Sequence, residues 1–176
     1  TKRVRDFAIV LDTSESPSGE LVKAFLKETF TLLKSADTFF AKCRVLVLQC
    51  DDAVRSETFL TDLDSLDRYA RNFVLKGGGG TDFRPAFARI EELRQEGRLR
   101  DLQGALYFTD GKGTYPSRRP GYDTAFLFLD NGEPPPEVPP WAMRLVIEPE
   151  ELIPPKAPAL PPMDWAQDEM DDLPQL

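Results

Sequence analysis

Side chains that end in oxygen follow the predicted strands at three places in the chain. Asp12, Ser14 and Ser16 follow the first strand and alternate with other residues. Thr81 follows a run of glycines, and Asp110 follows a later strand. Ligands of open α/β sheets bind outside the carboxyl ends of the strands. We therefore expect these side chains to share one edge of a sheet and to form a binding site there.

Carboxylate and hydroxyl oxygens, with no nitrogen or sulfur among them, suit a hard cation with octahedral preference. The set predicts Mg²⁺, with Mn²⁺ as the second choice. Because it brings few formal negative charges, a bound ion keeps its attraction for an anionic oxygen from outside, such as an Asp or Glu of a partner protein. The glycine run permits positive φ angles, which lets the backbone turn Thr81 toward the ion.

Residue types that are rare or missing exclude other chemistry. The 176 residues include no histidine, which excludes histidine acid/base catalysis, Ser-His-Asp triads and histidine-bound zinc within this chain. Cys43 and Cys50 are the two cysteines, too few for a disulfide framework or a cysteine-rich metal site. We expect reduced thiols and no enzymatic activity.

Two hydrophobic periods alternate along most of the chain. Short apolar runs predict strands over residues 6–11, 44–50, 54–60, 103–109, 124–129 and 141–147. Apolar residues at helical spacing predict a helix that begins near Ser16 and Pro17, and further helices over 62–73 and 83–96. Apolar strands separated by amphipathic helices indicate an α/β domain with a mostly parallel sheet that is covered on both faces.

Acidic residues and prolines concentrate toward the C-terminal end. Residues 131–176 hold 12 of the 16 prolines, 10 of the 30 acidic residues and only 2 of the 22 basic residues. We therefore divide the chain into a domain over 1–148 and a proline-rich acidic tail over 149–176. The net charge of -8 and the lack of a basic stripe argue against nucleic acid and anionic membranes as partners.

The tail has two interpretations. It is either a solubilising terminus without a packed structure, or a docking segment with Trp165 and Met170 as anchors. In the second case its acidic residues reach a metal site, either in this chain or in a neighbour. The sequence contains no export signal and no apolar run of about 20 residues, so we expect a cytoplasmic protein. The first residue, Thr1, suggests a fragment of a longer chain.

The motifs around these residues resemble a known site. Asp12-x-Ser14-x-Ser16, the later Thr81 and the Thr-Asp-Gly at 109–111 are similar to the metal-ion-dependent adhesion site (MIDAS) of von Willebrand factor type A (VWA) domains. Residues 4–147 resemble most closely the bacterial VWA-like domains found C-terminal to a predicted metallopeptidase domain. The segments that carry this closer resemblance are 49–51, 77–83, 107–111 and 139–142.

The resemblance implies a Rossmann-like fold. It implies a mostly parallel six-stranded sheet in the order 3-2-1-4-5-6, with helices on both faces and one antiparallel strand, 54–60, at the edge. It also implies a Mg²⁺ site of the MIDAS type. The metal ligands carried over are Asp12, Ser14, Ser16, Thr81 and Asp110.

The resemblance also implies an activity, namely metal-dependent binding of a protein partner that presents Asp or Glu. The domain would be a regulatory or substrate-recruiting module of a larger bacterial protein, and MoxR-type AAA+ ATPases are the associated partners. One position departs from the family pattern, because Glu15 stands where the family usually has glycine. This carboxylate either points to solvent or adds negative charge near the ion.

Other function classes compete with this interpretation. A receiver-like phosphotransfer domain also gathers Asp and Lys around Mg²⁺, but it needs an acidic pair after the first strand, where this chain has Asp12 and hydroxyls. A serine hydrolase based on Ser14 or Ser16 lacks a base. The chain could also be the accessory domain of a metallopeptidase whose catalytic part lies elsewhere. Asp51 and Asp52 are interpreted as a hairpin turn.

Overall fold

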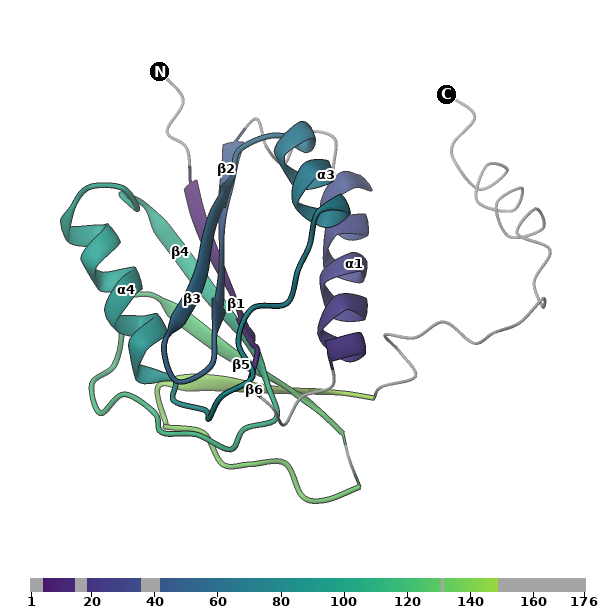
Figure 1. Ribbon diagram of the computed structural model, residues 1–176. Helices are drawn as coiled ribbons and strands as arrows, with labels where there is room; N and C mark the ends of the chain where they lie inside the picture. Colours follow the sequence, from purple (N-terminus) through teal and green to yellow (C-terminus); the bar gives the residue numbers. More distant parts are fainter. Residues whose placement is uncertain (1–4, 15–18, 36–41, 131, 149–176) are drawn as a thin grey trace, which may run out of the picture.

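A computed structural model describes residues 5–14, 19–35, 42–130 and 132–148 (Figure 1). The predicted helix start at Ser16 and Pro17 and the tail over 149–176 lie outside these residues. The elements follow one another as β1 (Arg5–Asp12), α1 (Gly19–Ser35), β2 (Cys43–Cys50), β3 (Val54–Leu60), α3 (Leu63–Arg71), α4 (Arg84–Gln95), β4 (Leu102–Thr109), β5 (Asp123–Leu129) and β6 (Ala142–Ile147).

The strands form one six-stranded sheet in the order β3-β2-β1-β4-β5-β6, which confirms the expected topology. All neighbouring strands are parallel except β2 and β3, which pair antiparallel. α1 and α3 lie on one face of the sheet and α4 lies on the other (Figure 1). β1 is central, so its carboxyl end lies between the ends of β2 and β4. This position makes the end of β1 the natural centre of a binding edge.

Local sequence explains where the helices begin and end. Asp62 caps α3, because its Oδ1 accepts a hydrogen bond from Ser65 N at 2.7 Å and the Ser65 side chain returns the contact. α3 ends at Arg71, two residues before the predicted end. α4 begins at Arg84 with Pro85 in its first turn, as the sequence suggests. Phe83 occupies the cap position, while Asp82 Oδ1 accepts from Arg84 N at 3.0 Å.

The two faces of the sheet have separate cores. On the α4 face, aromatic rings from α4, the strands and the loops pack together with centroids 4.8–6.4 Å apart. These rings belong to Phe83, Phe87, Tyr107, Tyr115, Phe126 and Trp141. On the other face, aliphatic side chains of α1 and α3 cover the central strands, and Phe25 stacks on Phe108 at 4.3 Å.

Helices lie on both faces of the sheet, as expected, but β6 at one edge is partly exposed. Met143 and Leu145 of β6 are 56% and 47% exposed. The described residues that connect β4 to β5 and β5 to β6 contain no helix, so no helix is available there to cover this end of the sheet. Leu63, the first residue of α3, is 41% exposed. No helix in the described part of the chain is long and apolar enough to cross a membrane.

Replacing Phe126 tests the aromatic core. Phe126 is fully buried and contacts the rings on both sides of it, so Phe126→Ala should lower the free energy of unfolding by about 3–5 kcal/mol. The exposed Leu63 offers a control, because Leu63→Ala should change it by no more than about 0.5 kcal/mol. Urea unfolding followed by circular dichroism measures both values, and equal losses would contradict the assigned burial.

Candidate functional site

Asp12 is the last residue of β1 and its side chain is completely buried. Its Oδ1 accepts a hydrogen bond from Ser14 N at 2.9 Å, and its Oδ2 accepts one from Thr109 Oγ1 at 2.5 Å. Burial raises the pKa of Asp12, and the charge of Asp110 adds to this rise, whereas the hydrogen bonds of Ser14 and Thr109 lower it. Asp12 is therefore held in one orientation and remains poorly solvated, which favours a counter-charge beside it.

Ser14 supplies a buried hydroxyl next to this carboxylate. Its Oγ lies close to Asp12, yet it forms no hydrogen bond of normal geometry with any described residue. Three more buried oxygens of the described chain lack such a partner, those of Thr13, Tyr107 and Tyr115. A buried polar atom without a partner calls for a water molecule or an ion. The orphaned Ser14 Oγ beside a buried carboxylate thus fits the donor set of a hard cation.

Thr81 lies on a loop that is tied to the end of the central strand. Gly78 N donates to Thr13 O at 2.8 Å, and Asp82 N donates to Asp51 O at 3.1 Å. Gly77 has a φ of 145°, and a Cβ there would lie 2.2 Å from Thr13 Oγ1, so only glycine permits this approach. The loop therefore brings the half-buried Thr81 to the edge that carries Asp12.

Asp110 follows β4 directly and is half-buried at the same edge. Its Oδ1 accepts from Lys112 N at 3.1 Å, which fixes the turn after the strand. Its charge raises the pKa of Asp12, so the two carboxylates are electrostatically close. The structure thus brings four of the predicted residues to one edge, namely Asp12, Ser14, Thr81 and Asp110. Ser16 and the unusual Glu15 lie outside the described residues.

The described residues contain no group of three or more His, Cys, Asp or Glu side chains placed to hold a metal ion. The predicted set has two carboxylates, Asp12 and Asp110. The other predicted ligands, Ser14, Ser16 and Thr81, bear hydroxyl groups and are not among these four residue types. A cation at this edge would therefore depend on serine and threonine oxygens as much as on charge.

Asp51 holds the glycine loop in place, a role that sequence reasoning missed. The residue is 2% exposed at the turn between β2 and β3. Its Oδ2 accepts from Gly79 N at 3.1 Å, and its Oδ1 accepts from Arg55 Nε at 2.7 Å and Ala53 N at 3.1 Å. Burial raises the pKa of Asp51, but these hydrogen bonds and the Arg55 charge outweigh it and lower the value to about 2.

Gln49 anchors the chain just before the glycines. It is 2% exposed, and its Oε1 accepts from Lys76 N at 2.8 Å. Its Nε2 donates to Val74 O at 3.2 Å and to Tyr69 Oη at 3.3 Å. A glutamine inside an otherwise apolar strand was the available signal, because a buried amide must find partners. Gln49 and Asp51 together fix the path that leads to Thr81.

Asp51→Asn should remove a stabilising contribution that depends on pH. Folding lowers the pKa of Asp51 from 3.8 to about 2, so the contribution is complete above about pH 4 and is lost as the pH falls toward about 2. The difference in unfolding free energy between wild type and variant should shrink over this range. Urea unfolding at several pH values measures it.

Asp52→Asn is the matched control, since the Asp52 side chain is 55% exposed and forms an exposed ion pair with Nη2 of Arg55. It should have a small effect at every pH. A wild-type advantage over Asp51→Asn that is as large near pH 2 as at neutral pH would show that the Asp51 charge does not stabilise the fold.

Comparison with known proteins supports the fold. The sequence family described as VWA-like domain (DUF2201) matches residues 7–148. Among solved structures, the SpRpn10 VWA domain superposes with a TM-score of 0.54 at 14% identity, covering 83% of this chain and 89% of that one. A structure of three N-terminal domains of the type V pili tip protein Mfa5 from Porphyromonas gingivalis matches with a TM-score of 0.50 at 18% identity, covering 65% of this chain and 21% of that one.

Proximal thread matrix protein 1 from the mussel byssus matches with a TM-score of 0.63 at 14% identity, covering 86% of this chain. The chain spans about half of the length of that protein, 45%. At these identities the structural matches show the fold alone. None of the curated proteins matches the sequence. The family match extends over most of the described fold, and the chain belongs to the VWA-like domain family.

Proposed function

We propose that this VWA-like domain is a protein-interaction module that binds a carboxylate of its partner in a Mg²⁺-dependent way, through a site of the MIDAS type. The observation that carries the proposal is the buried Asp12 carboxylate with the orphaned Ser14 Oγ beside it. Both follow the central strand, at the edge that also carries Asp110 and the loop of Thr81.

Each residue has a distinct role in the proposal. Asp12, Ser14, Thr81 and Asp110 would hold Mg²⁺, with Ser16 as the fifth ligand expected from the resemblance. The bound ion would supply positive charge that attracts an Asp or Glu side chain of the partner. Thr109 orients Asp12 through its hydroxyl, and Asp51 holds the loop that carries Thr81.

Binding rather than catalysis is favoured by the chemistry of the edge. Ser14 has no histidine to activate it, because the chain contains none. Asp12 is followed by hydroxyl residues rather than by the second acid that a receiver-like domain requires. We further propose a role as a recruiting or regulatory part of a larger protein, with a MoxR-type AAA+ ATPase as the first partner to test. Labelling with acetyl phosphate would reveal a phosphotransfer activity instead.

Mg²⁺ titration by calorimetry tests the metal site. The wild type should bind Mg²⁺ saturably, and Asp12→Asn should weaken binding by more than about tenfold because it removes the buried negative charge. Ser14→Ala should also weaken binding while leaving the carboxylate in place. Asp52→Asn is the control, since Asp52 is an exposed acid near the same edge. Absence of saturable binding to the wild type, or equal binding to Asp12→Asn, would refute the metal site.

Recognition of an acidic partner needs a separate test. Immobilised protein should retain the MoxR-type ATPase in Mg²⁺ and release it in EDTA, because the metal ion forms the contact. Asp12→Asn should retain little, and Asp52→Asn should retain as much as the wild type. Retention that is unchanged by EDTA would separate partner binding from the metal and would contradict this part of the proposal even if Mg²⁺ binds.

A further inference from the structure

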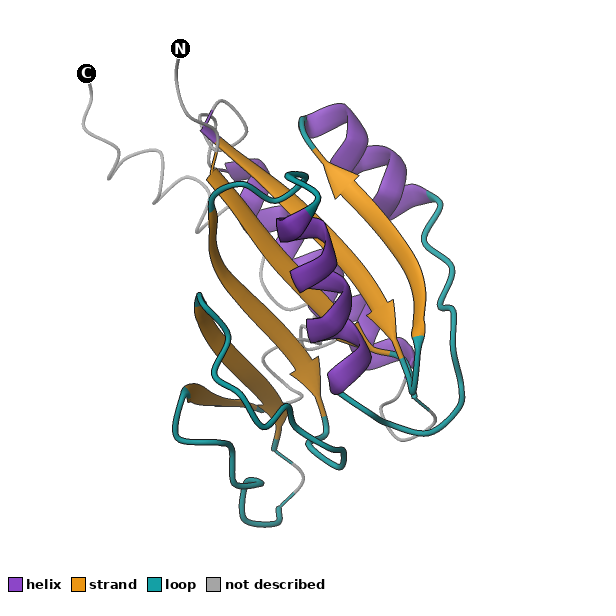
Figure 2. Cartoon of the chain, turned by 90° about the vertical axis from the view of Figure 1, so that its left-hand side faces the viewer, coloured by secondary structure: helices purple, strands orange, loops and turns teal. Residues whose placement is uncertain are grey.

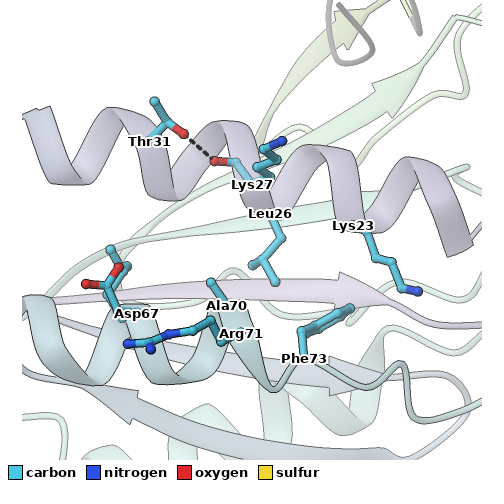
Figure 3. Close-up of a pocket in the computed structure, with 9 residues that line it drawn as sticks. Lys23, Leu26, Lys27, Thr31, Asp67, Ala70, Arg71 and Phe73 are labelled. Carbon is cyan, nitrogen blue, oxygen red and sulfur yellow. Dashed lines mark hydrogen bonds between the residues drawn. The ribbon is translucent and has the colours of Figure 1, made fainter.

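A groove separates α1 from α3 on the face of the sheet opposite α4 (Figure 3). Its volume is about 730 Å³. Leu26 of α1 and Leu66 of α3 lie at its floor and are 3% and 0% exposed. Ala70 and Phe73 add apolar surface from the α3 side (Figure 3). Leu26 and Leu66 therefore close the floor, and the accessible apolar surface of the groove comes from the exposed Ala70 and the partly exposed Phe73.

The rim of the groove is mainly cationic. Lys23 and Lys27 lie on successive turns of α1, and Arg71 ends α3 on the opposite side. Asp67 is the acidic residue among those that line the groove in the described chain. The ion pair of Lys23 with Glu20 is long, 3.9 Å, and exposed, so it holds the lysine weakly. An acidic segment with apolar anchors complements this combination.

The chain itself contains such a segment. Residues 164–173 carry five acidic residues and no basic one, and they include Trp165, Met170 and Leu173. Tryptophan is a common anchor in apolar pockets, and carboxylates pair with lysine and arginine at the rim of an interface. The segment therefore has the two properties that the groove calls for.

The fold places this segment within reach. β6 is the last described strand, and its Ile147 packs against the core cluster that includes Leu26 and Leu66. The last side chain of β6 therefore faces the side of the sheet that carries the groove. Residues 148–164 precede Trp165 and can span about 55 Å when extended, which is about twice the length of α1. Attachment to the same chain gives the segment a high effective concentration at the groove.

We propose that residues 164–173 dock in the groove between α1 and α3 of the same molecule. Trp165 packs against Ala70 and Phe73, and the acidic residues face Lys23, Lys27 and Arg71. The groove is then an interaction surface for an acidic, tryptophan-containing peptide, separate from the edge that carries Asp12. The proposal does not depend on metal binding, because it involves neither Asp12 nor its neighbours.

Hydrogen–deuterium exchange of the full chain in EDTA tests the proposal. In low salt the amides of residues 164–173 should exchange about tenfold more slowly than free-chain rates. The protection should fall in about 0.5 M NaCl, which screens the charges. Lys23→Glu combined with Lys27→Glu should abolish it. The control combines Arg118→Glu with Arg119→Glu, which makes the same charge change at two exposed residues away from the groove and should preserve it.

Trp165→Ala provides the reciprocal measurement without altering the domain. It should increase the acetylation rate of Lys23 and Lys27 and leave that of the exposed Lys76 unchanged. Free-chain exchange over 164–173 in the wild type would overturn the proposal, as would protection that survives the double lysine variant. Protection that appears only at high protein concentration would assign the contact to a second copy. Altered exchange around Met143 and Leu145 in Trp165→Ala would place the segment on β6 instead.

Discussion

The buried carboxylate of Asp12 is the constraint around which the binding edge is organised. Burying a charged group is costly unless hydrogen bonds or an opposite charge compensate. Thr109 and the backbone of Ser14 donate two hydrogen bonds to it, whereas a carboxylate can accept about four. The unused lone pairs and the orphaned Ser14 Oγ lie side by side, and a divalent cation would satisfy both.

A second buried carboxylate at the same edge has the opposite character. Asp51 is compensated by Arg55 and by two backbone N–H groups, which is why its pKa is lowered while that of Asp12 is raised. A carboxylate that is already paired does not compete for a cation. The edge thus contains one acid that fixes the loop and one that remains available, and only their surroundings distinguish them. Figure 2 shows how the strands converge on the loops of this edge.

Much of the fold could be predicted from the sequence, because its strands are apolar runs with clear limits. The strand predicted over 54–60 is β3 without any change of limits. β1 is longer than predicted by one residue at each end, and the other strands differ from prediction by one residue at their first position. Hydrophobic periodicity reports which side of an element is apolar, but it does not report whether another element covers that side. For this reason it does not reveal that Leu63 of α3 and Met143 and Leu145 of β6 are exposed.

The sequence marks the proposed ligands of the candidate site but not the contacts that position them. Asp12, Ser14, Thr81 and Asp110 were predicted from strand ends and a motif, and their role as ligands stays a prediction. The positioning contacts escaped because they join residues far apart in sequence, such as Asp51 with Gly79 and Gln49 with Lys76. Asp51 was interpreted as a turn residue, and this local explanation gave no reason to expect its hydrogen bond to the glycine loop. Thr109 was recognised as part of a motif, while its hydrogen bond to Asp12 depends on the register of β1 and β4.

The groove and the edge that carries Asp12 are linked by one short segment of backbone. Phe73 lines the groove, and the glycine loop that bears Thr81 begins only four residues later. Between them, Gln49 holds both Val74 O and Lys76 N. A peptide that shifts Phe73 could move Thr81 only by breaking these buried hydrogen bonds, each of which would leave a polar group unsatisfied. The two surfaces are therefore close together in the sequence. The hydrogen bonds of Gln49 nevertheless oppose the transmission of a movement from one surface to the other.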